Sequence, residues 1–188
     1  SLALDARGKF LAMRVSVICN TGAHSVMYVP LVKCSELLTS VYRVPAAHVR
    51  ARAALSNTVP TNPYRSAGRP EAMYIMERLI DIAATKLGFD KVELRRKNLV
   101  SEKAFPYANG VGAVYDSGEY DRALTKALDR VGYAKLRVEQ RERMERRDRW
   151  LLGIGMSCYV EQGRYGLPVK KSTWLYAYGV ELPELFPL

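Results

Sequence analysis

Thirteen residues between Thr58 and Pro70, TVPTNPYRSAGRP, carry three prolines and a glycine. Proline has no backbone N–H to donate to a helix or a sheet, so this segment is too interrupted for regular structure. We expect a loop of fixed shape. Apolar residues alternate with polar ones before it and recur every three or four residues after it. The chain is therefore expected to be an α+β protein, with a strand-rich amino-terminal part followed by a layer of amphipathic helices.

The helical part of the sequence begins directly after the loop. Apolar residues at three- and four-residue spacing, a proline in the first turn and a glycine after the last turn predict a helix over 70–87. Asp90, followed three residues later by Glu93, imitates a capping box and predicts a short helix that ends near Asn98. The same signals predict two further helices, over 120–131 and from about 133 to 149.

The chain before the loop carries strand signals. A turn from Asp5 to Gly8 separates two apolar stretches, which predicts a hairpin. Apolar residues that alternate with Arg50 and Arg52 predict a half-buried strand ending before Pro60.

A last strand is predicted over 151–162, LLGIGMSCYVEQ. No later segment looks able to pair with it, so we expect the chain to end inside a domain. An unpaired apolar edge is a route to aggregation, so the isolated chain is expected to be marginally soluble.

The charge of the chain allows two interpretations. There are 29 Lys+Arg against 19 Asp+Glu, a formal net charge of +10. Seven basic residues lie over 135–149, but four acidic residues are interleaved with them. Pairs such as Glu139 with Arg143 and Glu142 with Arg146 favour an exposed helix with intrahelical ion pairs. The alternative is a basic module that uses this helix to bind nucleic acid or an acidic partner, with nucleic acid less favoured.

The sequence lacks the motifs that are typical of nucleotide-binding sites and of metal sites. The chain has no GxxxxGK[ST] motif, and the GxG at 153–155 lies in a strand rather than at a strand-to-helix turn, so nucleotide binding is not expected. His24 and His48 have no carboxylate or cysteine at ligand spacing, so we expect no metal site.

The cysteines and the apolar stretches indicate the compartment. Cys19, Cys34 and Cys158 are far apart and odd in number, so they are expected to be buried thiols. No apolar stretch is long enough to span a bilayer, and the first residues lack the order of a secretory signal. These features predict a soluble, cytoplasmic protein without a membrane span.

The loop contains the best candidate for a binding site. Arg65 is followed by Ser66, Ala67 and Gly68, directly before the predicted helix. A cation in a shaped loop beside the N–H groups of a helix start suits an anionic or oxo-bearing ligand. The alternative is that Arg65 and Arg69 cap neighbouring elements or form ion pairs with them. Spacing alone favours this second interpretation without excluding the first.

Three motifs follow one another from the loop onward: Y-R-x-x-G-R-P-E-A over 64–72, E-R-x-x-D over 77–81 and E-L-R-R-K-N over 93–98. The stretch 58–100, which contains them, resembles the large, molybdenum-cofactor-binding subunit of the xanthine dehydrogenase, aldehyde oxidase and carbon monoxide dehydrogenase family. Segments 105–124 and 153–163 resemble later parts of the same subunit, and the predicted hairpin resembles an earlier part. The resemblance covers about residues 1–163.

The resemblance implies a redox function. Members of this family oxidise an aldehyde, an N-heterocycle or carbon monoxide, with water as the source of oxygen and a pterin-bound molybdenum as the reactive centre. Their electrons leave through iron–sulfur and FAD-binding subunits or domains. The matching arginine lies beside the cofactor, so the resemblance makes Arg65, Ser66, Ala67 and Gly68 the cofactor-binding residues. A fixed guanidinium and oriented amides there can stabilise negative charge that develops on oxygen.

The sequence also departs from the family pattern. Many purine and aldehyde members have an aromatic residue where this chain has Ala67, and carbon monoxide dehydrogenases of the molybdenum–copper type have a cysteine where it has Ser66. The family's glycine-rich cofactor loop, its glutamine–glycine segment and its catalytic glutamate have no counterpart here. We therefore expect residues 1–163 to be a partial molybdopterin-binding domain that includes the opening strand of a second cofactor-binding domain. Residues 164–188 are expected to be a tail without family resemblance. No catalytic residue is assigned, and the chain alone is expected to be inactive and to retain no cofactor.

Overall fold

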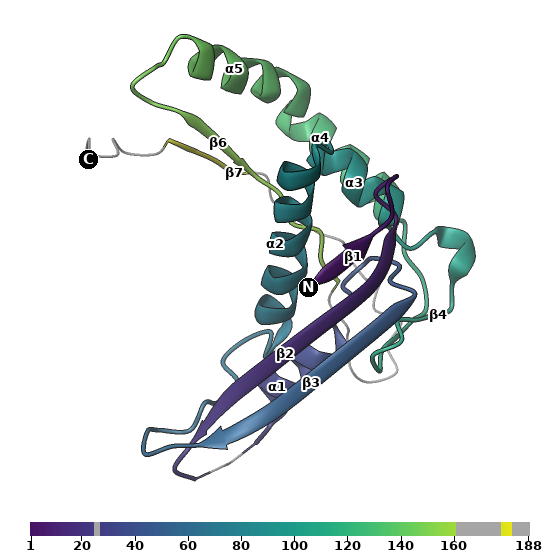
Figure 1. Ribbon diagram of the computed structural model, residues 1–188, viewed down its shortest axis with the longest axis vertical. Coiled ribbons are helices and arrows are strands. Elements are labelled where there is room, and N and C mark those ends of the chain that lie inside the picture. Colours follow the sequence, from purple (N-terminus) through teal and green to yellow (C-terminus); the bar gives the residue numbers. More distant parts are fainter. Residues whose placement is uncertain (25–26, 161–177, 182–188) are drawn as a thin grey trace.

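The computed structural model describes residues 1–24, 27–160 and 178–181. Figure 1 shows a long sheet, a helical layer beside it, and an arm formed by the later elements. The elements in chain order are β1 (Leu2–Leu4), β2 (Phe10–Gly22), α1 (Val29–Glu36), β3 (Ala46–Leu55), α2 (Arg69–Leu87), α3 (Lys91–Asn98), the 3-10 helix η1 (Glu102–Ala104), β4 (Tyr107–Ala108), β5 (Val114–Tyr115), α4 (Tyr120–Val131), α5 (Tyr133–Glu145), β6 (Leu152–Gly155) and β7 (Tyr178–Glu181). The α+β prediction is confirmed.

A three-stranded sheet in the order β1–β2–β3 forms the amino-terminal layer. β1 and β2 are antiparallel, as the predicted hairpin requires. In their turn, Asp5 Oδ1 accepts hydrogen bonds from the N–H groups of Arg7 at 2.9 Å and Lys9 at 2.8 Å, and Gly8 adopts a φ of 81°. The strand predicted before Pro60 is β3. It runs parallel to β2, which the alternation of residues did not reveal.

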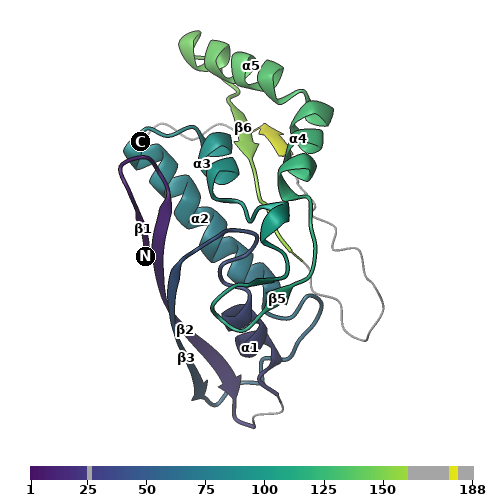
Figure 2. The same ribbon diagram turned by 90° about the vertical axis from the view of Figure 1, so that its right-hand side faces the viewer.

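The connection between β2 and β3 contains α1, a helix that the sequence pattern did not predict. Parallel strands need a crossover, most often a helix. Pro30 lies in the first turn of α1, where a proline is tolerated because the first N–H groups of a helix have no partner within it. Leu31 and Cys34 are the buried residues of α1, and Leu37 and Leu38 directly after it are fully buried. Figure 2 shows α1 and α2 on the same side of the sheet.

The helix predicted over 70–87 is α2. Its apolar stripe is buried, with Met76 and Ile80 at 0% exposure. Gly88 ends the helix with a φ of 74° and donates its N–H to the carbonyl of Ala84. This is the left-handed cap that the glycine predicted.

The short helix after α2 is α3. Asp90 caps its first turn, because one carboxylate oxygen accepts hydrogen bonds from the N–H groups of Val92 at 2.8 Å and Glu93 at 3.0 Å. The helix predicted over 120–131 is α4, which ends at Gly132 with a φ of 65°.

Three predictions about the arm were wrong. The helix predicted to reach residue 149 ends at Glu145, because Arg147 adopts a left-handed φ of 52° that a helix does not continue through. The last predicted strand is shorter than expected and ends at Gly155. Its predicted lack of a partner was also wrong, because β6 pairs antiparallel with β7. One edge of β6 is therefore paired, and no other described strand pairs with it. The rest of the tail over 164–188, and residues 161–162 of the predicted strand, lie outside the described residues.

The hydrophobic core lies between the sheet, α1, α2 and α3. It includes side chains from every one of these elements and from the segment after α1, among them Phe10, Met13, Val15, Leu37, Leu38, Val41, Tyr42, Met76, Ile80 and Leu94. The core fixes the position of α2 and therefore of the loop that precedes it.

Candidate functional site

The loop before α2 has an uncommon backbone at its end. Three successive residues have positive φ: Ser66 at 62°, Ala67 at 29° and Gly68 at 87°. Only glycine adopts this region without cost, and residues with side chains held there cluster at functional sites. The sequence predicted a shaped loop here but gave no sign that a serine and an alanine would be left-handed.

Gly68 is required by a close backbone contact as well as by its φ. A Cβ at this position would lie 2.0 Å from the carbonyl oxygen of Pro30 and 2.6 Å from the backbone nitrogen of Cys34. The end of the loop is therefore pressed against the first turns of α1. The helix that the sequence did not predict is the support on which the candidate site rests.

The start of the loop is held by a polar network at the tips of β2 and β3. The Ser56 hydroxyl donates to Asn20 Oδ1 at 2.6 Å, and Asn20 Nδ2 donates to the Thr58 hydroxyl at 3.0 Å. Gly22 lies so close to Pro60 that a Cβ would be 2.5 Å from the proline nitrogen. The loop is thus fixed at both ends.

The two arginines of the loop differ in their surroundings. Arg69 Nη1 donates to the carbonyl of Ser66 at 3.2 Å, and the Arg69 N–H donates to the same carbonyl at 3.0 Å. Arg69 therefore has the structural role that one interpretation of the sequence gave to both arginines. Arg65 is exposed, beside a Tyr64 that is 99% exposed, and takes part in no ion pair found among the described residues.

The four predicted site residues lie together at the start of a 19-residue helix. In the described part of the chain, no hydrogen bond uses the N–H groups of Ser66, Ala67 or Gly68. Backbone N–H groups at a helix start, with an exposed guanidinium next to them, favour an anion or a polarised oxygen. This donor set fits an oxygen-rich, negatively charged group.

A cavity of about 230 Å³ lies between β2, α1, the loop and the first turn of α2. Its lining includes Cys19, Cys34, Thr61 and Glu71. Burial raises the pKa of the Cys34 thiol to about 11, so this thiol is protonated at neutral pH. Cys34 and Cys158 are buried as predicted, whereas Cys19 is only half-buried.

A buried ion cluster fixes α2 against α3. Arg95 is fully buried, and its Nε donates to Glu77 Oε2 at 2.8 Å, while its Nη2 donates to Asp81 Oδ1 at 2.9 Å. The Tyr42 hydroxyl donates to the other Glu77 oxygen at 2.6 Å. Burial opposes the charge of Arg95, but attraction to Glu77 outweighs it and raises the pKa of the guanidinium, which stays protonated.

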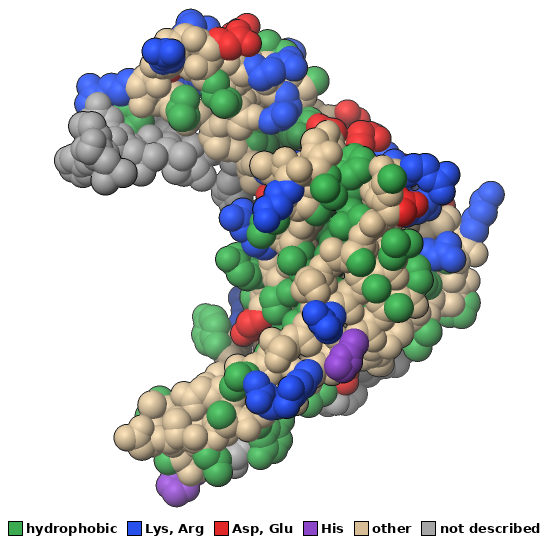
Figure 3. Space-filling view, in the orientation of Figure 1, with side chains coloured by type: hydrophobic (Ala, Val, Ile, Leu, Met, Phe, Trp, Pro, Cys, Tyr) green, Lys and Arg blue, Asp and Glu red, His purple; other side chains and the backbone are tan. Residues whose placement is uncertain are grey.

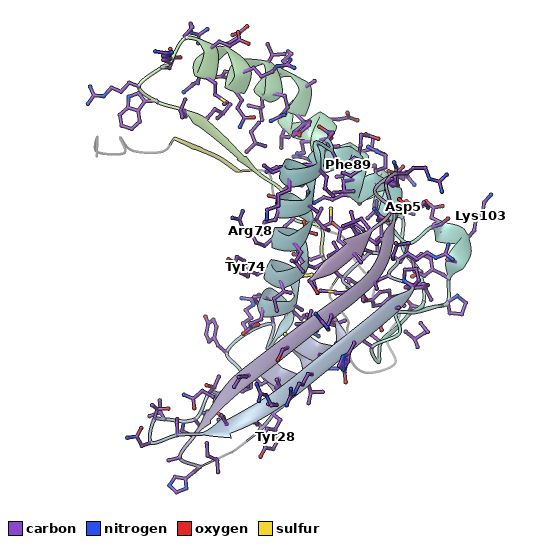
Figure 4. The ribbon with its side chains drawn as sticks, viewed as in Figure 1. Asp5, Tyr28, Tyr74, Arg78, Phe89 and Lys103 are labelled. Carbon is purple, nitrogen blue, oxygen red and sulfur yellow. The ribbon has the colours of Figure 1, made fainter. Side chains whose placement is uncertain are left out.

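Sequence reasoning identified three members of this cluster, Glu77, Asp81 and Arg95, only as parts of motifs. Glu77 falls on the apolar stripe of α2, between Met73 and Ile80, and a carboxylate on such a face is the signal that could have indicated a buried partner. Arg78, the arginine of the same motif, does not join the cluster: it is exposed, and Figure 4 shows it pointing outward from α2.

The basic helix α5 shows the ion pairs that its sequence predicted. Arg143 lies 2.6 Å from Glu139, and Arg146 lies 3.5 Å from Glu142. No residue of α5 is buried, which agrees with an exposed helix. Binding of nucleic acid or an acidic partner by this helix stays a hypothesis.

Two further features concern metal binding and membrane insertion of the described residues. Over residues 1–24, 27–160 and 178–181, no group of three or more His, Cys, Asp and Glu side chains is arranged to hold a metal ion. Within those same ranges, every helix is too short or too polar to cross a bilayer.

Replacing Gly68 by alanine is expected to lower the free energy of unfolding by about 2–4 kcal/mol, from left-handed strain and overpacking together. Urea denaturation measures the loss. Gly110→Ala is the matched control, because Gly110 has a φ of 76° but no neighbour within 4 Å of a new Cβ. We expect the control to lose only about 1–2 kcal/mol. Equal losses in the two variants would show that the contact with α1 does not require the glycine.

Comparison with known proteins identifies the family. A sequence model of the molybdopterin cofactor-binding domain matches residues 1–99. The carbon monoxide dehydrogenase large chain of Hydrogenophaga pseudoflava is 36% identical over 166 residues, which cover 85% of this chain and 21% of the relative. The 6-hydroxypseudooxynicotine dehydrogenase complex subunit gamma of Paenarthrobacter nicotinovorans is 31% identical over 173 residues, 88% of this chain and 22% of the relative.

Solved structures agree with the sequence comparison. The crystal structure of quinoline 2-oxidoreductase from Pseudomonas putida 86 superposes with a TM-score of 0.77 at 31% identity and covers 85% of this chain and 21% of that one. A Cu,Mo-CO dehydrogenase superposes with a TM-score of 0.75 at 35% identity, with the same coverage. The chain spans about a fifth of the length of these relatives. The resemblance seen in the sequence is confirmed, and the chain belongs to the molybdopterin cofactor-binding domain family.

Proposed function

We propose that this chain is part of the catalytic subunit of a molybdenum hydroxylase and that its loop over 65–68 forms one wall of the cofactor site. The observation that carries the proposal is the loop itself. Its three left-handed residues and its exposed arginine stand at the start of α2, on a chain whose family binds molybdopterin. The relatives named as large chain, large subunit or complex subunit are parts of larger assemblies.

Each residue of the loop has a role in this proposal. The bound cofactor would supply the redox centre that oxidises an aldehyde, an N-heterocycle or carbon monoxide, with water as the oxygen source. Arg65 offers an exposed positive charge, and the N–H groups of Ser66, Ala67 and Gly68, which make no described hydrogen bond, offer neutral donors from the backbone of the loop. Such preorganised donors stabilise negative charge without having to reorient during the reaction. Arg69 keeps the loop in shape through the carbonyl of Ser66.

Ala67 and Ser66 limit the range of substrates that the site could oxidise. Ala67 leaves open the space that an aromatic side chain would take beside a flat ring, which argues against a purine. Ser66 has a hydroxyl rather than a thiol, and a hydroxyl is a poor ligand for copper. We therefore favour a site without copper and disfavour a purine as its substrate.

We also propose a role for the rest of the chain, partners for the subunit and a cellular compartment. Residues 1–163 would be a piece of the cofactor-binding domain, completed by cofactor loops and a catalytic glutamate from elsewhere in the subunit. Electrons would pass to iron–sulfur and FAD-binding subunits or domains. The reduced thiols and the sequence pattern favour the cytoplasm as the compartment.

Cofactor content tests the proposal. The 188-residue chain and a longer polypeptide from the same coding region would be produced with their neighbouring subunits, and molybdenum would be measured by mass spectrometry. Pterin would be measured as its fluorescent oxidation product. We expect both in the longer polypeptide and neither, in stoichiometric amount, in the 188-residue chain. Absence of pterin from a folded longer polypeptide would overturn the proposal, and a 188-residue chain that holds molybdenum and reduces a dye would show that it is not a fragment.

A further inference from the structure

The strand β3 is a long edge of the sheet. It pairs with β2 on one side, and no other described strand pairs with it. Its ten residues run from Ala46 to Leu55, and the last six of them are exposed. A strand of this length with unpaired N–H and C=O groups can pair with another polypeptide.

One face of this edge carries positive charge. Side chains alternate between the faces of a strand, so His48, Arg50 and Arg52 lie on the same face. Across the ladder, the residues beside them on β2 are Arg14, Ser16 and Ile18, in that order. Figure 3 shows basic and histidine side chains grouped over β2 and β3.

No carboxylate neutralises this face in the described part of the chain. None of the ion pairs there includes Arg14, Arg50 or Arg52, although ion pairs are frequent on α3 and α5. Two arginines two residues apart on one strand, next to a third on the neighbouring strand, repel one another. A row of carboxylates on an added strand would relieve this repulsion.

The opposite face of β3 carries small, apolar side chains. Val49, Ala51 and Ala53 alternate with the cations, and the two alanines are exposed. An added strand could therefore place apolar side chains over this face. The strand that fits would alternate between acidic and apolar residues in register with β3.

A second copy of this chain does not fit the same edge. In an antiparallel pair centred on Ala51, Arg50 of one copy lies opposite Arg52 of the other. In a parallel pair in register, each arginine lies beside its own counterpart. Like charges directly opposite each other destabilise a sheet. The edge is thus protected against self-pairing and open to a partner of opposite charge.

We propose that the edge of β3 binds an extended acidic segment of another polypeptide, in which Asp or Glu alternates with apolar residues, as an additional strand of the sheet. The segment's carboxylates pair with Arg50 and Arg52, and its apolar side chains lie over Ala51 and Ala53. This surface is separate from the cofactor loop, and the inference does not depend on the proposed function.

The test uses the full chain and a fluorescent peptide, acetyl-Thr-Glu-Val-Glu-Val-Glu-Val-Thr-amide, with its lysine counterpart as the control ligand. Fluorescence anisotropy at low ionic strength measures binding, and hydrogen exchange locates it. We expect the acidic peptide to bind about tenfold more tightly than the lysine peptide, since at least two cross-strand charge pairs change sign. Binding should protect amides of β3 and weaken as salt is added.

Two charge-reversed variants make the test specific. The R50E/R52E variant is expected to reverse the preference between the two peptides. The K135E/R141E variant changes the net charge equally on α5 and is expected to keep the original preference. Matching thermal melts would show that both variants fold. Equal binding of the two peptides, protection outside β3, or loss of the preference in both variants would overturn the proposal. So would an R50Q/R52Q variant that self-associates while the original chain binds neither peptide, because the arginines would then only prevent aggregation.

Discussion

Replacing Arg95 by alanine is expected to lower the free energy of unfolding by about 3–5 kcal/mol, the usual loss when one partner of a buried ion pair is removed. The substitution leaves Glu77 inside the protein, 6% exposed, with the Tyr42 hydroxyl and the backbone N–H of Cys158 as its remaining polar partners but no positive charge beside it. It also removes one of the two ion pairs that join Asp81 to α3 and leaves the pair with Lys91 at 3.2 Å. Urea denaturation at pH 7 measures the loss, which would loosen the packing of α2 against α3.

The exposed ion pair between Arg122 and Glu119 provides the matched control for the Arg95→Ala variant. Arg122 lies 2.8 Å from Glu119, and both side chains are more than half exposed. Arg122→Ala is expected to cost less than about 1 kcal/mol, because exposed pairs are screened by water. Similar losses for Arg122→Ala and Arg95→Ala would contradict the structural role of the buried cluster.

The pH dependence of the Arg95→Ala variant provides a second check. Burial raises the pKa of Glu77, and the charge of Arg95 opposes this rise. Without Arg95 the pKa of Glu77 rises further in the folded variant, while the unfolded chain keeps a pKa of about 4.3. The folded variant then binds a proton more readily than the unfolded chain, so its deficit shrinks as the pH falls from 7 toward about 5. A deficit that grows over this interval would show that Glu77 is not left as a buried charge.

Local chemistry made the main helices of this fold predictable. Gly88 and Gly132 end α2 and α4 because each adopts a left-handed φ, and Asp90 begins α3 because its carboxylate accepts two backbone N–H groups. These signals act within one turn of the chain, so they can be recognised without knowledge of the neighbours. The hairpin turn at Asp5 is local in the same sense.

Features that depend on distant partners could not be predicted in this way. The parallel pairing of β2 and β3 and the pairing of β6 with β7 join segments that carry no mutual signal in the sequence. The helix α1 was not predicted, because its eight residues are too short a stretch for helical periodicity to be recognised. The ion cluster required Arg95, which no periodicity connects with Glu77.

The position of the candidate site in the sequence could be predicted, but the backbone conformation of its loop could not. Arg65 and Gly68 could be assigned from the loop sequence and from the family motif. The left-handed backbone of Ser66 and Ala67 could not, because neither residue type indicates a positive φ. The separation of the two arginines into an exposed one and a structural one also required the structure, since only Arg69 lies within reach of the Ser66 carbonyl.

Replacing Arg65 by alanine in the longer polypeptide is expected to lower turnover by about one to three orders of magnitude, the usual loss when one preorganised stabilising donor is removed. Stability should change little, because Arg65 is exposed and belongs to no described ion pair. Arg130→Ala is a suitable control, since it removes an exposed arginine from α4 without touching the loop. Turnover of the control is expected to stay at the level of the unchanged polypeptide.

Turnover per molybdenum atom, compared between the Arg65→Ala and unchanged polypeptides, is the most direct test of the claim that this loop lies at the cofactor. Normalising to molybdenum separates a slower reaction from a loss of cofactor, and the thermal melt separates both from misfolding. The proposal predicts a fall of about tenfold or more per molybdenum atom, with an unchanged melt. Unchanged turnover at full molybdenum content would show that Arg65 does not act at the cofactor.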